Sequence, residues 1–224
     1  MGKRNFGKHL KERGKKLERK RVGIVLFEDI EVLDFCGPFE VFSAFRLYEE
    51  QRREEPSPFD VWLVAENPEP VTTTGNMKVI PHYTFENCPA LDILVVPGGW
   101  GTRKELKNLI MLDWLRARAA EVETLTSVCT GSMLLGFAGL LDGRHATTHW
   151  RSLDWMRDAF PEVKVEFEKH VVEDGRVVTS AGISAGIDMA LRVVARYFGE
   201  NIARATARHM EYAYPDSNER RVRL

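Results

Sequence analysis

The chain has 224 residues and a formal net charge of −1, a length at which a single α/β domain with a sizeable buried core is ordinary. Its three cysteines (Cys36, Cys88 and Cys129) are widely spaced and form no CxxC pair, which predicts reduced thiols instead of a disulfide framework or a zinc site. No apolar run approaches the roughly 20 residues of a membrane span, and residues 1–21 lack the apolar segment of a secretory signal. These features predict a cytoplasmic protein with no membrane contact.

The charge is distributed unevenly. Residues 1–21 hold ten basic residues and two acidic ones, a net charge of +8, which leaves −9 for the rest of the chain. We interpret this basic N-terminal arm as a solvated extension; binding to nucleic acid is the less favoured alternative. Phe6, Leu10 and Leu17 fall near one helical face, so a short helix is expected there.

Beyond the arm, strand and helix patterns alternate. The apolar runs predict strands at 22–27, 59–65, 93–96, 124–128, 163–166, 169–172 and 177–180, and a small ribbon at 71–79. Helices are expected from Gly37-Pro38 onward and over 102–120, 133–141, 183–197 and 201–212. This alternation predicts a doubly wound α/β domain over 22–214, with a mostly parallel sheet between helices and a charged tail at 215–224.

Cys129 falls where a strand becomes a helix. The β-branched stretch 124–128 precedes it, and small residues follow it in the short connection Cys129-Thr130-Gly131-Ser132. A turn this tight strains the backbone and presents the side chain at the edge of the sheet, as in a nucleophile elbow. The start of the following helix should favour a thiolate. The alternative is an inert buried cysteine.

Other segments should converge on the same edge of the sheet. The loop Pro97-Gly98-Gly99-Trp100 follows a buried strand, and the backbone N–H groups of Gly98 and Gly99, with that of Thr130, are candidates for an oxyanion hole. An ordinary glycine turn is the equal alternative.

Two titratable side chains also belong to these segments. Asp34 is a candidate proton donor beside the sulfur, although from the residues alone a helix cap is the better interpretation. His149 is a candidate partner of the thiol, although a structural histidine is more common.

Five segments in this order resemble the ThiJ/PfpI superfamily, whose fold is flavodoxin-like and similar to class I glutamine amidotransferases. They are Val-Leu-Asp-Phe-Cys-Gly-Pro (32–38), Val-Pro-Gly-Gly (96–99), Ser-Val-Cys-Thr-Gly-Ser (127–132), Ala-Thr-Thr-His-Trp (146–150) and Ser-Ala-Gly-Ile-Ser-Ala-Gly-Ile-Asp (180–188). Within the superfamily, the chain looks most like isonitrile hydratases and the ligand-binding domains of AraC-type regulators.

The resemblance to the hydratases implies specific roles. Asp34 and the pair Cys129-Thr130 match catalytic positions of the hydratases, and other branches usually carry Glu where this chain has Asp34. The implied reaction adds water to a small isonitrile through a covalent thioimidate, without a metal or other cofactor, in a homodimer. Cys36 stands where the hydratases usually have a small hydroxyl residue. We expect Cys36 either to narrow the pocket or to act as a redox partner, and we expect Trp100 to restrict what enters the pocket.

The alternatives are a non-catalytic ligand-binding or oxidation-sensing domain, and another family activity such as a glyoxalase, deglycase or peptidase. A peptidase would depend on a Cys–His pair, whereas a hydratase would depend on Asp34.

Overall fold

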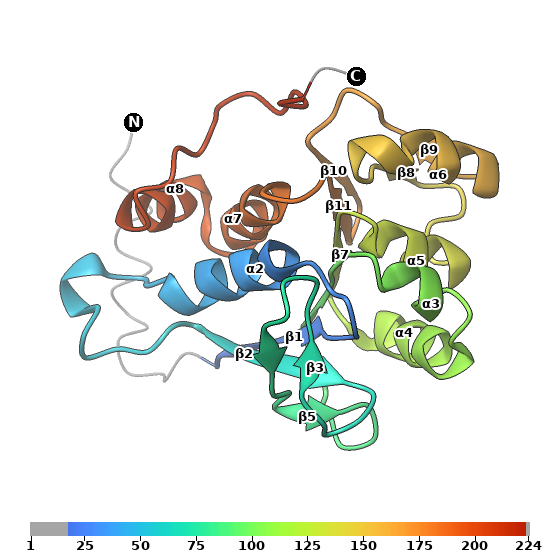
Figure 1. The fold of residues 1–224 in the computed structure, drawn as a ribbon. Helices are drawn as coiled ribbons and strands as arrows, with labels where there is room; N and C mark the ends of the chain where they lie inside the picture. The colour runs from blue at the N-terminus through green and yellow to red at the C-terminus, as the bar shows by residue number, and fades with distance from the viewer. Residues whose placement is uncertain (1–17, 223–224) are drawn as a thin grey trace.

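The structure is a computed structural model that describes residues 18–222. A central sheet lies between two layers of helices (Figure 1). The helix expected around Phe6, Leu10 and Leu17 lies outside the described residues. Lys20 and Arg21, the last residues of the basic segment, are the first two of strand β1.

The main sheet has seven strands in the order β10-β11-β7-β6-β1-β2-β5, and only β10 runs antiparallel to its neighbour. Sequence neighbours such as β1 and β2 pair directly, with Val22 opposite Val61. Because β1, β6 and β7 are parallel, the segments that follow them meet at one edge of the sheet. The strands are β1 (Lys20–Val25), β2 (Phe59–Ala65), β5 (Tyr83–Thr84), β6 (Ile93–Val96), β7 (Thr124–Val128), β10 (Val171–Asp174) and β11 (Val177–Ser180).

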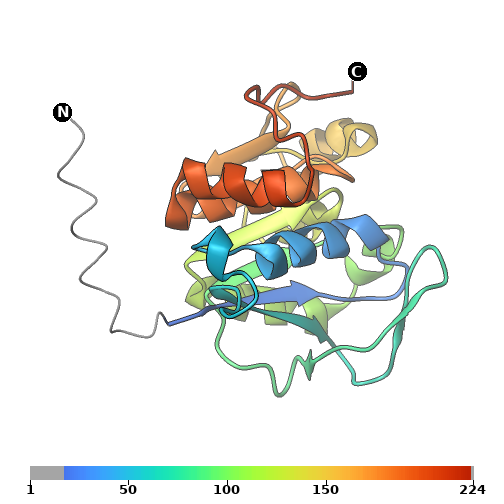
Figure 2. The same ribbon diagram turned by 90° about the vertical axis from the view of Figure 1, so that its left-hand side faces the viewer.

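Helices α2 (Val32–Ala44), α7 (Ala185–Phe198) and α8 (Glu200–His209) cover one face of the sheet. Figure 2 is seen from the side of this layer, where α2 and α7 lie next to each other. The opposite face is covered by α3 (Thr102–Glu105), α4 (Leu109–Glu121) and α5 (Gly131–Phe137) (Figure 1). The sheet is therefore buried on both sides, and all five residues of β7 are buried.

Helix α2 begins earlier than predicted. Its first turn starts at Val32, where the Asp34 N–H donates to the Glu31 carbonyl, so Pro38 is inside the helix and not in its first turn. Pro38 lacks the N–H that would bond to the carbonyl of Asp34, a loss that this helix tolerates. Asp34 therefore lies within a helix, not before one.

The helix expected over 102–120 is two helices. The break comes at Asn108, whose side-chain oxygen accepts hydrogen bonds from the backbone N–H groups of Ile110 and Met111 and so caps α4. Helix α5 also ends sooner than predicted, because Gly139 follows it with a left-handed φ of 72°.

Short elements surround this core. The predicted ribbon is present as β3 (Val71–Thr72) and β4 (Lys78–Val79), and a second pair is formed by β8 (His145–Ala146) and β9 (Lys164–Val165). The sequence patterns did not predict the 3-10 turns η2 (Glu49–Gln51) and η3 (Trp150–Ser152) or helix α6 (Leu153–Ala159). Among residues 18–222, no helix is long and apolar enough to cross a membrane.

Candidate active site

Cys129 forms the predicted elbow. It is the residue directly after β7, it has a φ of 56°, and α5 begins two residues later. A side chain with a β-carbon rarely adopts this left-handed conformation, so the backbone at Cys129 is strained. This conformation places the sulfur at the edge of the sheet where β1 and β6 end and the segments after them begin.

Hydrogen bonds from three segments hold this strained backbone. The Cys129 carbonyl accepts hydrogen bonds from the hydroxyl groups of Ser132, at 3.0 Å, and Thr148, at 2.9 Å. Its N–H points at the carbonyl oxygens of Ser180 and Ala181, both 3.2 Å away. The elbow is therefore fixed in place before any ligand binds.

Asp34 is fully buried beside the thiol. Its Oδ2 accepts a hydrogen bond from the Gly98 N–H at 2.9 Å, and the carboxyl also interacts with the Cys129 side chain. Its Oδ1 has no hydrogen-bond partner of normal geometry among the described residues. Residue Glu31, not Asp34, occupies the N-cap position of α2, so Asp34 is not the helix cap.

The pKa values of both groups are raised. Burial raises the pKa of Asp34 well above its usual range, against the opposing effect of the Gly98 N–H. Burial also raises the pKa of the Cys129 thiol, and the charge of Asp34 raises it further, while the N–H and hydroxyl of Thr130 oppose this. Burial of the sulfur therefore opposes the thiolate that the start of the helix was predicted to favour, and the thiolate stays a prediction.

The glycine loop differs from its predicted role. The Gly98 N–H donates to Asp34, and the Gly99 N–H donates to the Thr130 hydroxyl at 3.1 Å. Since both donors already have partners, neither points at a substrate, and the predicted oxyanion hole is wrong for these two residues. The loop instead supports the site: a β-carbon on Gly98 would lie 2.5 Å from the Thr130 nitrogen, and Gly99 has a φ of 131°.

Thr130 links the elbow to the helix layer. Its hydroxyl contacts the hydroxyl of Thr102 at 3.2 Å as well as the backbone of Gly99. Its backbone N–H interacts with the Cys129 sulfur. Thr130 is therefore the member of the predicted oxyanion hole whose N–H lowers the pKa of the nucleophile.

His149 lies in the same cavity as Cys129 but is not paired with it. Its Nδ1 accepts a hydrogen bond from the Arg151 N–H at 3.3 Å. Burial lowers the pKa of His149. Nearby guanidinium groups lower it further; they belong to Arg151, Arg220 and Arg103. Among the described residues no carboxylate orients this ring, so the arrangement is not that of a Cys–His–acid triad.

Cys36 is outside the cavity. Consecutive residues of a helix are separated by about 100°, so Cys36 points away from the face of α2 that carries Asp34. It packs against the core instead, and burial raises the pKa of its thiol. The prediction that Cys36 narrows the pocket is wrong, because the sequence pattern did not place it on a helix. Trp100, in contrast, lies at the mouth and is 63 % exposed.

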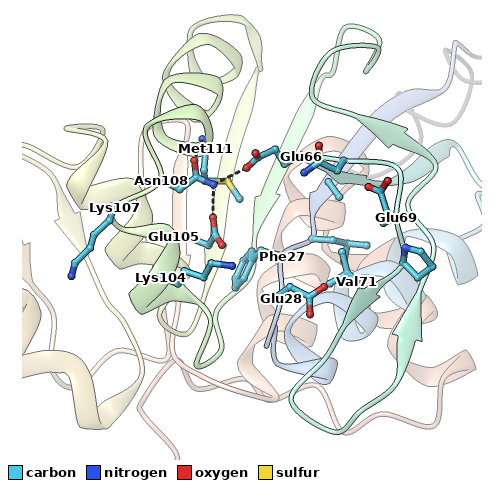
Figure 3. Close-up of a pocket in the computed structure, with 14 residues that line it drawn as sticks. Phe27, Glu28, Glu66, Glu69, Val71, Lys104, Glu105, Lys107, Asn108 and Met111 are labelled. Atoms are coloured by element: carbon cyan, nitrogen blue, oxygen red, sulfur yellow. Dashed lines mark hydrogen bonds between the residues drawn. The ribbon is translucent and has the colours of Figure 1, made fainter.

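The cavity lined by Cys129 has a volume of about 210 Å³, and Cys129 as a residue is 6 % exposed. A larger cavity of about 500 Å³ lies between the ends of β1 and β2 and the start of α4. In this cavity Asn108 bridges the carboxylates of Glu66 and Glu105 (Figure 3). Cys129 lines the smaller cavity and not the larger one, so we assign the chemistry to the smaller cavity.

Several residues of the site were not predicted. Thr148 holds the elbow, and Arg103 and Arg151 line the cavity. Arg220, in the predicted tail, donates hydrogen bonds to the Thr147 hydroxyl and the Thr148 carbonyl. In residues 18–222, no group of three His, Cys, Asp or Glu side chains is placed to hold a metal ion.

The fold and the elbow define an α/β protein with a cysteine at the edge of a mostly parallel sheet. Residues 20–196 match the DJ-1/PfpI family, and the chain therefore belongs to this family. The ThiJ/PfpI resemblance noted in the sequence is thus confirmed.

The relatives include an enzyme and a transcriptional regulator. The chain is 37% identical to an isonitrile hydratase from Pseudomonas putida over 194 residues, which cover 86% of this chain and 78% of the relative. It is also 32% identical to the transcriptional regulator GbdR of Pseudomonas aeruginosa, covering 63% of this chain but only 38% of the regulator. The crystal structure of a ThiJ/PfpI family protein from Pseudomonas syringae matches with a TM-score of 0.77 and 30% identity, covering 89% of this chain and 78% of that one.

Proposed function

We propose that this chain is an isonitrile hydratase, in which Cys129 is the nucleophile and Asp34 is the acid and base. The observation that carries the proposal is a fully buried carboxyl with a raised pKa, in contact with the thiol of a strained elbow. A carboxyl of this kind holds its proton to a higher pH than an exposed one and can release it to a reacting carbon. The 37% identity to an isonitrile hydratase supports the same reaction.

In the reactive form, Asp34 carries a proton and Cys129 is a thiolate. The Thr130 N–H stabilises this thiolate. The sulfur attacks the terminal carbon of R–N≡C, and the proton of Asp34 moves to that carbon, which gives a thioimidate. The ionised Asp34 then takes a proton from water while the water oxygen adds to the carbon, and it passes this proton to the nitrogen. When the C–S bond breaks, the hydroxyl proton returns to Asp34, and an N-substituted formamide leaves.

An assay with a simple aryl isonitrile tests this proposal, with methylglyoxal measured in parallel. We expect formamide production by the wild type, none by Cys129→Ala, and full activity of Cys88→Ala, a matched cysteine variant outside the cavity. Turnover of methylglyoxal but not of the isonitrile would contradict the proposal. A peptidase would instead require His149, which the hydratase reaction does not use.

The second candidate is a non-catalytic ligand-binding or sensing domain, favoured by the similarity to the regulator GbdR. It would bind small molecules at Cys129 without turnover, so the same assay separates the two candidates. The homodimer and the cytoplasmic location expected from the sequence stay predictions.

A further inference from the structure

Two guanidinium groups stand at the mouth of the Cys129 cavity. Arg103, on α3, and Arg151, in η3, both line it. Each lies over an indole ring: Arg103 is 4.5 Å from the ring centre of Trp100, and Arg151 is 4.8 Å from that of Trp150. The proposed hydration reaction uses neither arginine, so their position needs another explanation.

These two charges are not neutralised within the part of the chain that the structure describes. Other arginines pair with acids, as Arg52 does with Glu49 and Arg204 with Asp216. Arg103 and Arg151 form no such ion pair, and their guanidinium groups make no hydrogen bond to residues 18–222. Glu31 is the one carboxylate among the cavity-lining residues, and it lies beyond ion-pair distance of both.

The cavity interior is consequently electropositive. Burial lowers the pKa of His149, which lines the same cavity as the thiol, and the guanidinium groups of Arg151, Arg220 and Arg103 lower it further. His149 is therefore neutral in this field and does not add to it. A positive, partly apolar pocket of about 210 Å³ selects a small ligand that carries a negative charge.

We propose that the substrate is an isonitrile bearing a carboxylate, which Arg103 and Arg151 bind while the isonitrile carbon reaches Cys129. A guanidinium is planar and matches a carboxylate with two parallel hydrogen bonds, and the indole beneath it holds its plane in place. The cavity is small, so the carboxylate and the isonitrile are separated by only a few bonds. The isonitrile part of this inference rests on the proposed function, whereas the anion site does not.

Alkylation of Cys129 tests the anion site without any turnover. Iodoacetate and iodoacetamide have nearly the same shape, but only iodoacetate is charged. We expect the double variant Arg103→Gln/Arg151→Gln to lower the rate for iodoacetate relative to iodoacetamide by about tenfold, as measured on the Cys129 peptide by mass spectrometry. Arg208→Gln, an exposed arginine on α8 outside the cavity, removes one charge and should leave the ratio unchanged. An unchanged ratio in the double variant would overturn the inference.

Turnover tests the substrate class. Wild type should hydrate isocyanoacetate with a higher kcat/KM than its methyl ester, and the double variant should lose about tenfold more for the acid than for the ester. Equal values for acid and ester in wild type would overturn the substrate class. If wild type hydrates the aryl isonitrile but neither of these compounds, the substrate class fails and the proposed function stands. If it hydrates none of the three, both fail, and a tenfold change in the alkylation ratio would still establish the anion site.

Discussion

Replacing Asp34 with Asn removes the proposed proton carrier with almost no change of shape. The amide oxygen can still accept the 2.9 Å hydrogen bond from the Gly98 N–H, so the helix and the glycine loop should stay in place. General acid–base catalysis contributes about 10²–10⁴ in rate, which corresponds to about 3–5 kcal/mol of barrier. We expect isonitrile hydration, measured as formamide formed per minute, to fall by that factor in Asp34→Asn.

Thermal unfolding of the same variant supplies the control. Because burial raises the folded-state pKa of Asp34, its contribution to stability is complete at low pH and is lost as the pH rises through that value. Asparagine does not ionise, so the Tm of Asp34→Asn should rise relative to the Tm of wild type as the pH rises. A folded Asp34→Asn with hydration within threefold of wild type would refute the acid–base role.

Other predictions concern the support of the site. Thr148→Val removes one of two hydroxyl donors to the Cys129 carbonyl and should cost about 1 kcal/mol, seen as a Tm lower by about 2–4 °C. Gly98→Ala places a β-carbon 2.5 Å from the Thr130 nitrogen and should reduce hydration sharply; an unaffected rate would show that the loop can move aside. Arg220→Ala should lower kcat, with partial rescue by Arg220→Lys, because this arginine holds the segment that carries Thr148. Activity against pH should rise and then fall, since the reactive pair holds one proton; a flat profile across neutral and alkaline pH would contradict this.

Much of the fold follows from local pattern. The buried β-branched runs give β1, β2, β6 and β7 at nearly the predicted places, and small residues after Cys129 permit the elbow. The start of α2 was predicted too late because of Pro38. Proline is usually found in the first turn of a helix, whereas Pro38 is the seventh residue of α2. The break between α3 and α4 at Asn108 was also not predicted, although an asparagine before an apolar run is a recognised signal for a helix cap.

The sequence predicted fewer features of the site than of the fold. The residues alone favoured a cap for Asp34, and only the family resemblance placed it beside the sulfur. Arg103, Arg151 and Arg220 come from separate segments, and nothing local indicates that they meet around His149. The effect of burial on the pKa of Cys129 was also missed, because the position before a helix is visible in a sequence whereas burial of a single sulfur is not.

Mass spectrometry during a single turnover tests the central claim most directly. With enzyme in excess over an aryl isonitrile, the peptide that contains Cys129 should gain the full mass of the isonitrile, and the adduct should decay as the formamide appears. Formamide released at the wild-type rate with no adduct on Cys129 at any time would contradict the account.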